Sequence, residues 1–154
     1  AYMSTEPFYY DYMKVEDVGQ YYQDFFEDFD LKKFREVISR SDLDESMKVR
    51  NLSSGMSAKL KIAATISRKA ALCLLDEPLN GIDYKAREEI ISLILEEADG
   101  ENTFVISTHL LEEVESFIEY AIFFKDGHLA DKVNLESERM KSGRSLTELY
   151  TDIL

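Results

Sequence analysis

Apolar residues in the first third of the chain recur at the spacing of amphipathic helices. Between residues 15 and 29 they fall every three or four positions, and a second set follows Asp30, a residue suited to cap a helix. A polar break at residues 41–45 separates them from a third stripe, which opens at Leu52-Ser53-Ser54-Gly55-Met56 and continues to about Arg68. The pattern therefore predicts a small helical lobe.

The pattern changes at residue 70, where a short apolar run begins. Residues 70–75 are all apolar and lead directly into Asp76 and Glu77, after which the chain turns at Pro78 and Gly81. Such a run predicts a strand that is buried on both faces, as in a parallel sheet. Residues 103–107 have the same character and predict a second buried strand.

A helix is expected after each of these strands. The first is capped by Asp83 and continues to about Ala98, and the second covers residues 110–118. Strand, helix, strand and helix joined by short connections predict a right-handed parallel arrangement, and hence an α/β fold. The residues expected to face inward on the first helix are Ile90, Ile91, Ile94 and Leu95.

Two local sequence signals predict structure near the end of the chain. The dipeptide Asp126-Gly127 is flanked by residues 121–125 and 128–133, which predicts a β-hairpin. Ser145-Leu146-Thr147-Glu148 is a capping box that predicts a terminal helix to Leu154. We expect two parts, a helical subdomain over residues 1–69 and an α/β part over residues 70–154.

Candidate catalytic and metal-binding residues lie where the predicted strands end. Asp76 and Glu77 follow the first strand, and His109 follows the second. Ligands of open α/β sheets bind beyond the carboxyl ends of the strands, so these side chains are expected on one rim. Adjacent strand residues point in different directions, so the two carboxylates are expected to have different roles. One such division is a magnesium ligand and a base that positions water. The ordinary alternative is a strand that ends in an acidic turn.

A second candidate site is the start of the third helix. Ser53, Ser54 and Gly55 precede or begin this helix, whose free backbone N–H groups and positive dipole end suit an anion. The ordinary alternative is that a serine simply caps the helix.

Composition narrows the class of protein. The 154 residues are 45% hydrophobic and carry a net charge of −13, which argues against non-specific binding to nucleic acid or anionic lipid. Cys73 is the single cysteine and is expected to be a buried thiol in a reducing compartment. No apolar run approaches the ~20 residues of a membrane helix.

Four motifs stand in a fixed order: LSSGM at 52–56, LCLLDE at 72–77, NGID at 80–83 and STH at 107–109. In this order they resemble the signature, Walker B strand, D-loop and switch histidine of the ATP-binding-cassette (ABC) ATPases. The resemblance covers nearly the whole chain. It implies a P-loop NTPase-like parallel sheet with flanking helices and a small helical subdomain.

The resemblance also implies roles for the residues on the predicted rim. Asp76 would help to hold Mg²⁺, Glu77 would polarise the attacking water, and His109 would contact the γ-phosphate of ATP. The remaining family positions are assigned to the ATP of an opposite subunit and to the dimer interface; they are Ser53, Ser54, Gly55 and Asp83.

The chain departs from the family pattern in two respects. The phosphate-binding loop GxxxxGK[ST] is missing, since none of the six glycines precedes a lysine. Thr5 occupies the position of the Q-loop glutamine, which makes a magnesium contact there uncertain. The chain also begins with Ala1. We therefore expect an incomplete fragment of an ABC nucleotide-binding domain, without useful ATP affinity when isolated.

The resemblance implies an ATPase subunit of a transporter, and the runs MSAKLKIAATIS and SLTELYTDIL look most like two-component exporters. Expected partners are a second ATPase subunit and a polytopic membrane subunit, which would hold the protein on the cytoplasmic face of the cell membrane. No nucleic-acid partner is expected. Aromatic residues near the start form either core contacts or the docking surface for that membrane subunit: Phe8, Tyr9, Tyr10 and Tyr12.

Two other functions remain open. One is a non-transport ABC ATPase, although the basic surfaces or long coiled-coil insertion expected of such relatives are missing here. The other is a docking module without catalytic activity.

Overall fold

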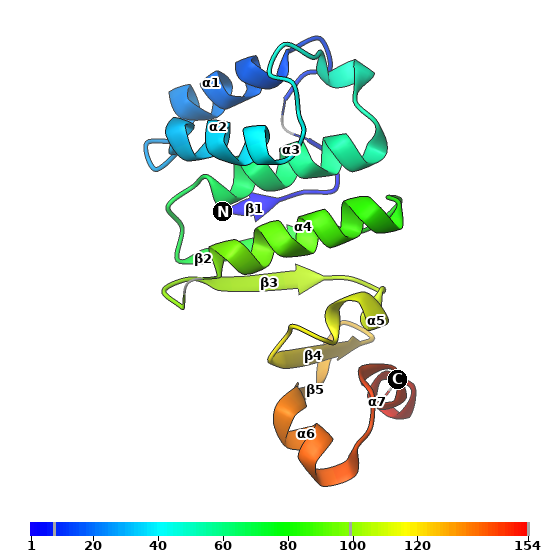
Figure 1. Cartoon of the computed structure of the whole chain (residues 1–154). Helices are drawn as coiled ribbons and strands as arrows, with labels where there is room; N and C mark the ends of the chain where they lie inside the picture. Colours follow the sequence, from blue (N-terminus) through cyan, green and yellow to red (C-terminus); the bar gives the residue numbers. More distant parts are fainter. Residues whose placement is uncertain (8, 99, 154) are drawn as a thin grey trace. The chain divides into compact units, whose positions relative to one another are not determined.

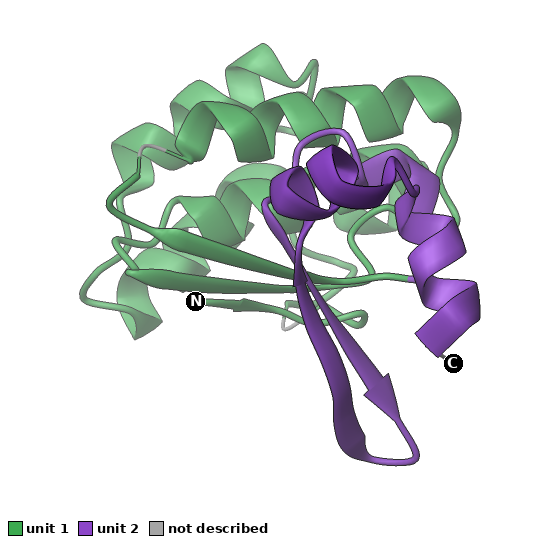
Figure 2. Ribbon diagram, turned by 90° about the horizontal axis from the view of Figure 1, so that it is seen from below, with its two compact units in different colours: residues 1–108 green, residues 109–154 purple. Residues whose placement is uncertain are grey.

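The computed structural model describes residues 1–7, 9–98 and 100–153. They form two compact units, residues 1–108 and 109–154, which Figure 2 distinguishes by colour. Among the described residues, no helix is both long and apolar enough to cross a membrane.

The first unit contains a three-stranded sheet in the order β1–β2–β3, formed by β1 (Tyr2–Met3), β2 (Leu72–Asp76) and β3 (Thr103–Ser107). Both pairings are parallel, and Asp76 at the end of β2 lies opposite Ser107 at the end of β3. The predicted parallel α/β arrangement is confirmed. Pairing with β1 also places the first residues of the chain in the sheet.

The two-sided burial predicted for these strands is wrong. Cys73 and Leu75 are buried, but Leu72 and Leu74 between them are 46% and 38% exposed. On β3 the side chain of Val105 is 44% exposed. Successive strand side chains point to opposite faces, and the described residues of this unit cover only one of the two.

Helices α1 (Val15–Phe25), α2 (Leu31–Arg40), α3 (Ser54–Ile66) and α4 (Tyr84–Glu97) and the short 3₁₀ helix η1 (Val49–Asn51) complete the unit (Figure 1). The predicted caps are present. The side chains of Asp30, Ser53 and Asp83 accept hydrogen bonds from backbone N–H groups three residues later, at 3.0, 3.2 and 3.1 Å. These bonds use donors that the first helical turn leaves unpaired.

Two helix predictions need correction. The first helix ends at Phe25 instead of Phe29, because Phe29 bridges to Arg68 and packs its buried ring against Tyr22 and Phe34. On α4, Leu93 is buried and Leu95 is 47% exposed, so the inward side includes Leu93 in place of Leu95.

The second unit is built around a hairpin of β4 (Tyr120–Lys125) and β5 (His128–Asn134). Its turn residues, Asp126 and Gly127, have φ angles of +50° and +77°, as the Asp-Gly signal predicted. The buried ring of Phe123 packs against Tyr150, with ring centroids 6.4 Å apart.

Helices in the second unit differ partly from the prediction. Helix α5 (Leu111–Val114) is much shorter than the expected helix over residues 110–118. Helix α6 (Leu135–Ser142) was not predicted, although Asn134 caps its start and Gly143, at φ +68°, ends it. The capping box that opens α7 (Leu146–Ile153) is confirmed, whereas the predicted end at Leu154 lies outside the described residues.

Candidate functional site

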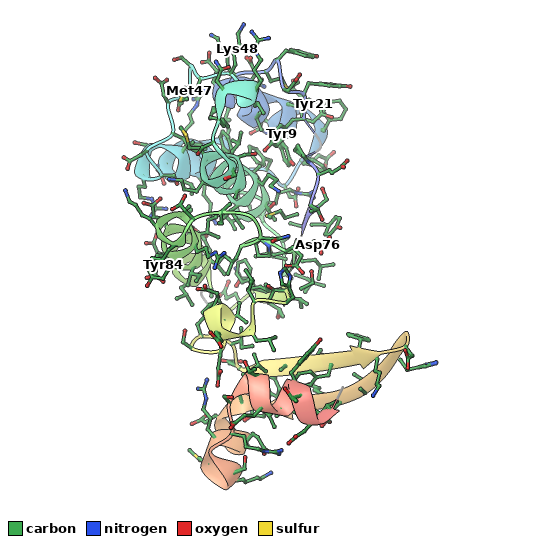
Figure 3. All side chains as sticks on the ribbon, turned by 90° about the vertical axis from the view of Figure 1, so that its right-hand side faces the viewer. Tyr9, Tyr21, Met47, Lys48, Asp76 and Tyr84 are labelled. Atoms are coloured by element: carbon green, nitrogen blue, oxygen red, sulfur yellow. The ribbon has the colours of Figure 1, made fainter. Side chains whose placement is uncertain are left out.

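Polar side chains from all three strands of the first unit meet at the carboxyl end of the sheet. The Ser107 hydroxyl donates to Oδ1 of Asp76 at 2.6 Å, and the Thr5 hydroxyl donates to Oδ2 at 3.0 Å. Tyr2 lies at the edge of this cluster, with its hydroxyl 3.5 Å from the same carboxylate oxygen. Figure 3 labels Asp76 at this edge. The parallel register of the strands brings these groups together because all three strands end on the same side.

The hydrogen bonds to Asp76 favour its ionised form. They lower the pKa of its carboxyl group, with Ser107 the larger cause and Thr5 the second. The carboxylate and hydroxyl oxygens fit Mg²⁺, which commonly uses one or two protein carboxylates together with water and phosphate oxygens. No group of three or more potential metal-binding His, Cys, Asp or Glu residues occurs in the described part of the chain.

Lys61 is a member of this cluster that the sequence analysis did not single out. Its Nζ donates to the backbone carbonyl of Thr5 at 2.9 Å, and burial lowers the pKa of its ammonium group. The charge of Lys61 also contributes to the low pKa of Asp76. This contact joins α3 to the loop after β1 across 56 residues, so no local sequence signal could have revealed it.

Glu77 leaves the regular path of β2. Its φ is +46°, and its N–H donates to the carbonyl of Ser107 at 2.9 Å. A non-glycine residue in the left-handed region costs conformational energy, and such positions concentrate at functional sites. The side chain is half-buried. Glu77 is therefore held directly beside the Asp76–Ser107 contact by its backbone.

His109 begins the second unit, two residues after Ser107 along the chain. Its predicted meeting with Asp76 and Glu77 around one triphosphate stays a prediction.

A second cluster lies where α3 and α4 begin. Gly55 is buried, and a Cβ built on it would lie 2.8 Å from Cβ of Ala86 and 3.5 Å from Oδ2 of Asp83. Ser53 and Ser54 are exposed beside this contact. Figure 3 labels Tyr84, the residue after Asp83, on a different side of the first unit from Asp76. The candidate residues thus form two clusters, one around Asp76 and one around Gly55.

The hydrogen bonding of the second cluster favours the ordinary role for Ser53. Its Oγ accepts from the N–H of Met56, as a simple N-cap does. The additional anion-binding role of this helix start stays a prediction.

The aromatic residues near the start of the chain separate into a buried and an exposed set. Tyr9 is buried, and this burial raises the pKa of its phenol. Tyr10 and Tyr12 are 58% and 63% exposed and stack on each other, with ring centroids 5.3 Å apart. Phe8 lies outside the described residues. The core interpretation therefore applies to Tyr9, whereas the docking role of Tyr10 and Tyr12 stays a prediction.

The chain as a whole is similar to known ATP-binding proteins. A family model described as "AAA domain, putative AbiEii toxin, Type IV TA system" matches residues 7–115. The chain is 36% identical over 131 residues to the bacitracin transport ATP-binding protein BcrA of Enterococcus faecalis, covering 77% of this chain and 42% of BcrA. It is 28% identical over 136 residues to the ABC transporter ATP-binding protein YtrB of Bacillus subtilis, covering 88% and 47% respectively. The chain thus spans less than half the length of these curated relatives.

The fold is similar to solved structures of the same class. The ATP-binding subunit of an ABC transporter superposes with a TM-score of 0.85 at 22% identity, covering 99% of this chain and 67% of that structure. The AAA-type family match, the named relatives and the shared fold together show that the chain belongs to the ABC transporter ATPases and corresponds to part of their ATP-binding domain.

Proposed function

We propose that the protein carrying this chain hydrolyses ATP to drive a membrane transporter, and that this transporter is a two-component exporter. The single observation that carries the proposal is the convergence of Thr5, Asp76 and Ser107 at the carboxyl ends of three parallel strands, with Glu77 adjoining. Phosphoryl transfer depends on positioning and charge neutralisation, and this edge offers groups for both. Transport is favoured over a non-transport ABC ATPase because the relatives described above are named as transport proteins.

The proposed catalytic roles follow the geometry of the rim. Asp76 holds Mg²⁺, which neutralises charge on the phosphates of ATP. Glu77 polarises the attacking water, and His109 contacts the γ-phosphate. The fixed backbone of Glu77 supports its role because a water-positioning group must be held in one place before the reaction begins.

The cluster around Gly55 is proposed to act on a second subunit. Ser53, Ser54 and Gly55 bind the γ-phosphate of ATP held by the opposite subunit, and Asp83 lies at the dimer interface. The contact of Gly55 with Ala86 beside Asp83 supports this assignment, because it keeps the start of α3 close to the residue proposed for the interface. ATP then closes the dimer and hydrolysis releases it, a two-state change that a transport partner can use. In this scheme residues 1–69 supply the helical subdomain and residues 70–154 the second part of the ATPase core.

The substitution Glu77→Gln in the full-length protein tests the catalytic assignment. We expect ATP to be retained and turnover to fall by roughly 10²–10⁴-fold, the usual contribution of a general base. Glu136→Gln is the matched control, because it makes the same change at an exposed position on α6 and should hydrolyse ATP normally. Unchanged hydrolysis in Glu77→Gln would remove Glu77 from this role.

The isolated 154-residue chain provides a second test. Because its sequence has no GxxxxGK[ST] loop to surround the phosphates, we expect no useful ATP affinity. Isothermal titration of the chain with MgATP measures this directly. Micromolar affinity would show that the phosphates are held without that loop.

The exposed pair Tyr10 and Tyr12 is proposed to contact a polytopic membrane subunit, which would keep the protein on the cytoplasmic face of the membrane. Stacked, exposed aromatic rings suit an interface because they offer a large contact area with little conformational freedom to lose. The double change Tyr10→Ala and Tyr12→Ala should reduce co-purification with the membrane subunit while basal hydrolysis continues. Tyr120→Ala, at an exposed tyrosine of the second unit, is the control. Co-purification with ribosomes or nucleic acid instead would overturn the transport assignment.

A further inference from the structure

Lys59 is a buried lysine of α3 that the proposed chemistry does not use. Its side chain is only 9% exposed, and its Nζ donates to the carbonyl oxygen of Ser41 at 2.9 Å and to Oε2 of Glu89 at 2.7 Å. The contact with Lys59 is the largest cause of the lowered pKa of Glu89. A buried ammonium group is costly unless it is paired, and these two acceptors satisfy it.

The two acceptors come from different helices. Ser41 caps the carboxyl end of α2, where backbone carbonyls carry the negative end of the helix dipole, and Glu89 belongs to α4. Lys59 therefore connects three helices at one point. A neighbouring ion pair between α2 and α4, Arg40–Glu96, lies at the exposed surface instead, with side chains 54% and 53% exposed.

Lys59 lies on α3 one helical turn after Gly55, which is at the start of the helix. Gly55 contacts Ala86, and Lys59, one turn further along α3, pairs with Glu89, one turn further along α4. The two contacts show that α3 and α4 run side by side in the same direction here. The ion pair therefore lies on the same helix contact as Gly55, for which a built Cβ would stand 3.5 Å from Oδ2 of Asp83.

We propose that Lys59 is a positioning residue that holds the start of α3 in register with Asp83, so that Ser53 and Gly55 can bind the phosphate of the opposite subunit. This inference rests on the proposed function. It predicts an effect on ATP-driven dimer closure that is separate from any effect on stability.

Two variants should rank in opposite order by their loss of stability and by their loss of dimer closure. Glu89→Gln leaves the ammonium of Lys59 buried with only the Ser41 carbonyl and a neutral amide, so it should destabilise the fold more than Lys59→Met does. Lys59→Met removes the buried charge and keeps an apolar chain of similar length, and Glu89, one-third exposed, can be hydrated. However, only Lys59→Met breaks both connections to α3. It should therefore impair closure more than Glu89→Gln does.

The experiment uses the full-length protein in the hydrolysis-blocked Glu77→Gln background. Dimer formation is followed by size-exclusion chromatography with light scattering over a range of MgATP concentrations, and melting temperature is measured on the same samples. We expect Lys59→Met to raise the ATP concentration for half-dimerisation by roughly tenfold, the change that a lost charged hydrogen bond of typical strength produces in an equilibrium constant.

Two control variants separate positioning from general loosening of the helices. Lys59→Arg keeps the charge and the donors, and Arg40→Met removes an exposed α2–α4 pair, so each should stay within about twofold of the parent. If Lys59→Met cannot be purified, Lys59→Gln takes its place with the same expected shift.

Each outcome decides a specific claim. An unchanged ATP concentration for half-dimerisation in Lys59→Met overturns the positioning role and leaves the proposed function intact. The same conclusion follows if Glu89→Gln shows a larger shift that follows its loss of melting temperature. A parent that forms no dimer with ATP overturns the proposed function, and the inference fails with it.

Discussion

Gly55 and Ala86 lie so close that α3 and α4 leave no space for a side chain at residue 55. A Cβ there would stand 2.8 Å from Cβ of Ala86, closer than two carbon atoms pack. The close approach brings the start of α3 against the first turn of α4, which Asp83 caps. The glycine is thus required by the packing of the two helices, although its φ angle is not in the left-handed region.

Substitution of Gly55 tests this packing. Alanine normally stabilises a helix relative to glycine by about 0.5–1 kcal/mol. Here we expect Gly55→Ala to destabilise the chain, because overpacking costs about 1–3 kcal/mol. Urea unfolding followed by circular dichroism measures the change. The double variant with Ala86→Gly should be more stable than the sum of the two single changes predicts, and simple additivity would argue against the contact.

The pKa of Asp76 should respond to its hydroxyl neighbours. Removing the Ser107 hydroxyl with Ser107→Ala should raise the pKa of Asp76 toward its ordinary value, because the ionised carboxylate loses its strongest hydrogen bond. Thr5→Val should give a smaller rise. Carboxyl carbon shifts in an NMR pH titration of the chain report both values, and a larger effect from Thr5 would reverse the assigned order.

Acid should weaken the junction at Lys59. The folded-state pKa of Glu89 is lowered below its usual 4.5, mainly by Lys59, so this pair contributes stability above that pH. The contribution is lost as pH falls through the lower folded-state value, because the protonated carboxyl group no longer attracts the ammonium. We expect the melting temperature of Glu89→Gln to approach that of the parent at acid pH. A constant difference from pH 7 down to pH 3 would contradict this linkage.

The uncovered face of the sheet should make the isolated chain associate. Leu72, Leu74 and Val105 expose apolar surface on one face, and such patches favour self-association. Leu74→Ser should lower the apparent mass seen by light scattering at high protein concentration without unfolding the chain. Leu75→Ser, on the buried face of the same strand, should unfold it instead. Equal effects of the two changes would contradict the one-sided burial.

Much of the fold was predictable because its signals are local. The caps at Asp30, Ser53 and Asp83 and the box at Ser145 each involve bonds that span three residues, which the sequence displays directly. Helix α6 also had such signals in Asn134 and Gly143, and it was missed because its apolar pattern is weak. For the candidate site, the motif order led to Asp76, Glu77 and the start of α3, whereas Lys59 and Lys61 could not be found.

The sequence by itself determined the starts of most helices, the hairpin turn, the parallel order of β2, α4 and β3, and the acidic pair that follows β2. These features depend on backbone hydrogen bonds and on residues that are close along the chain. Only the tertiary structure decided which face of the sheet is covered, that Thr5 and Ser107 meet at Asp76, and that Lys59 joins three helices. Such contacts join residues 18 to 71 positions apart, and their partners are selected by packing, which short-range patterns do not encode.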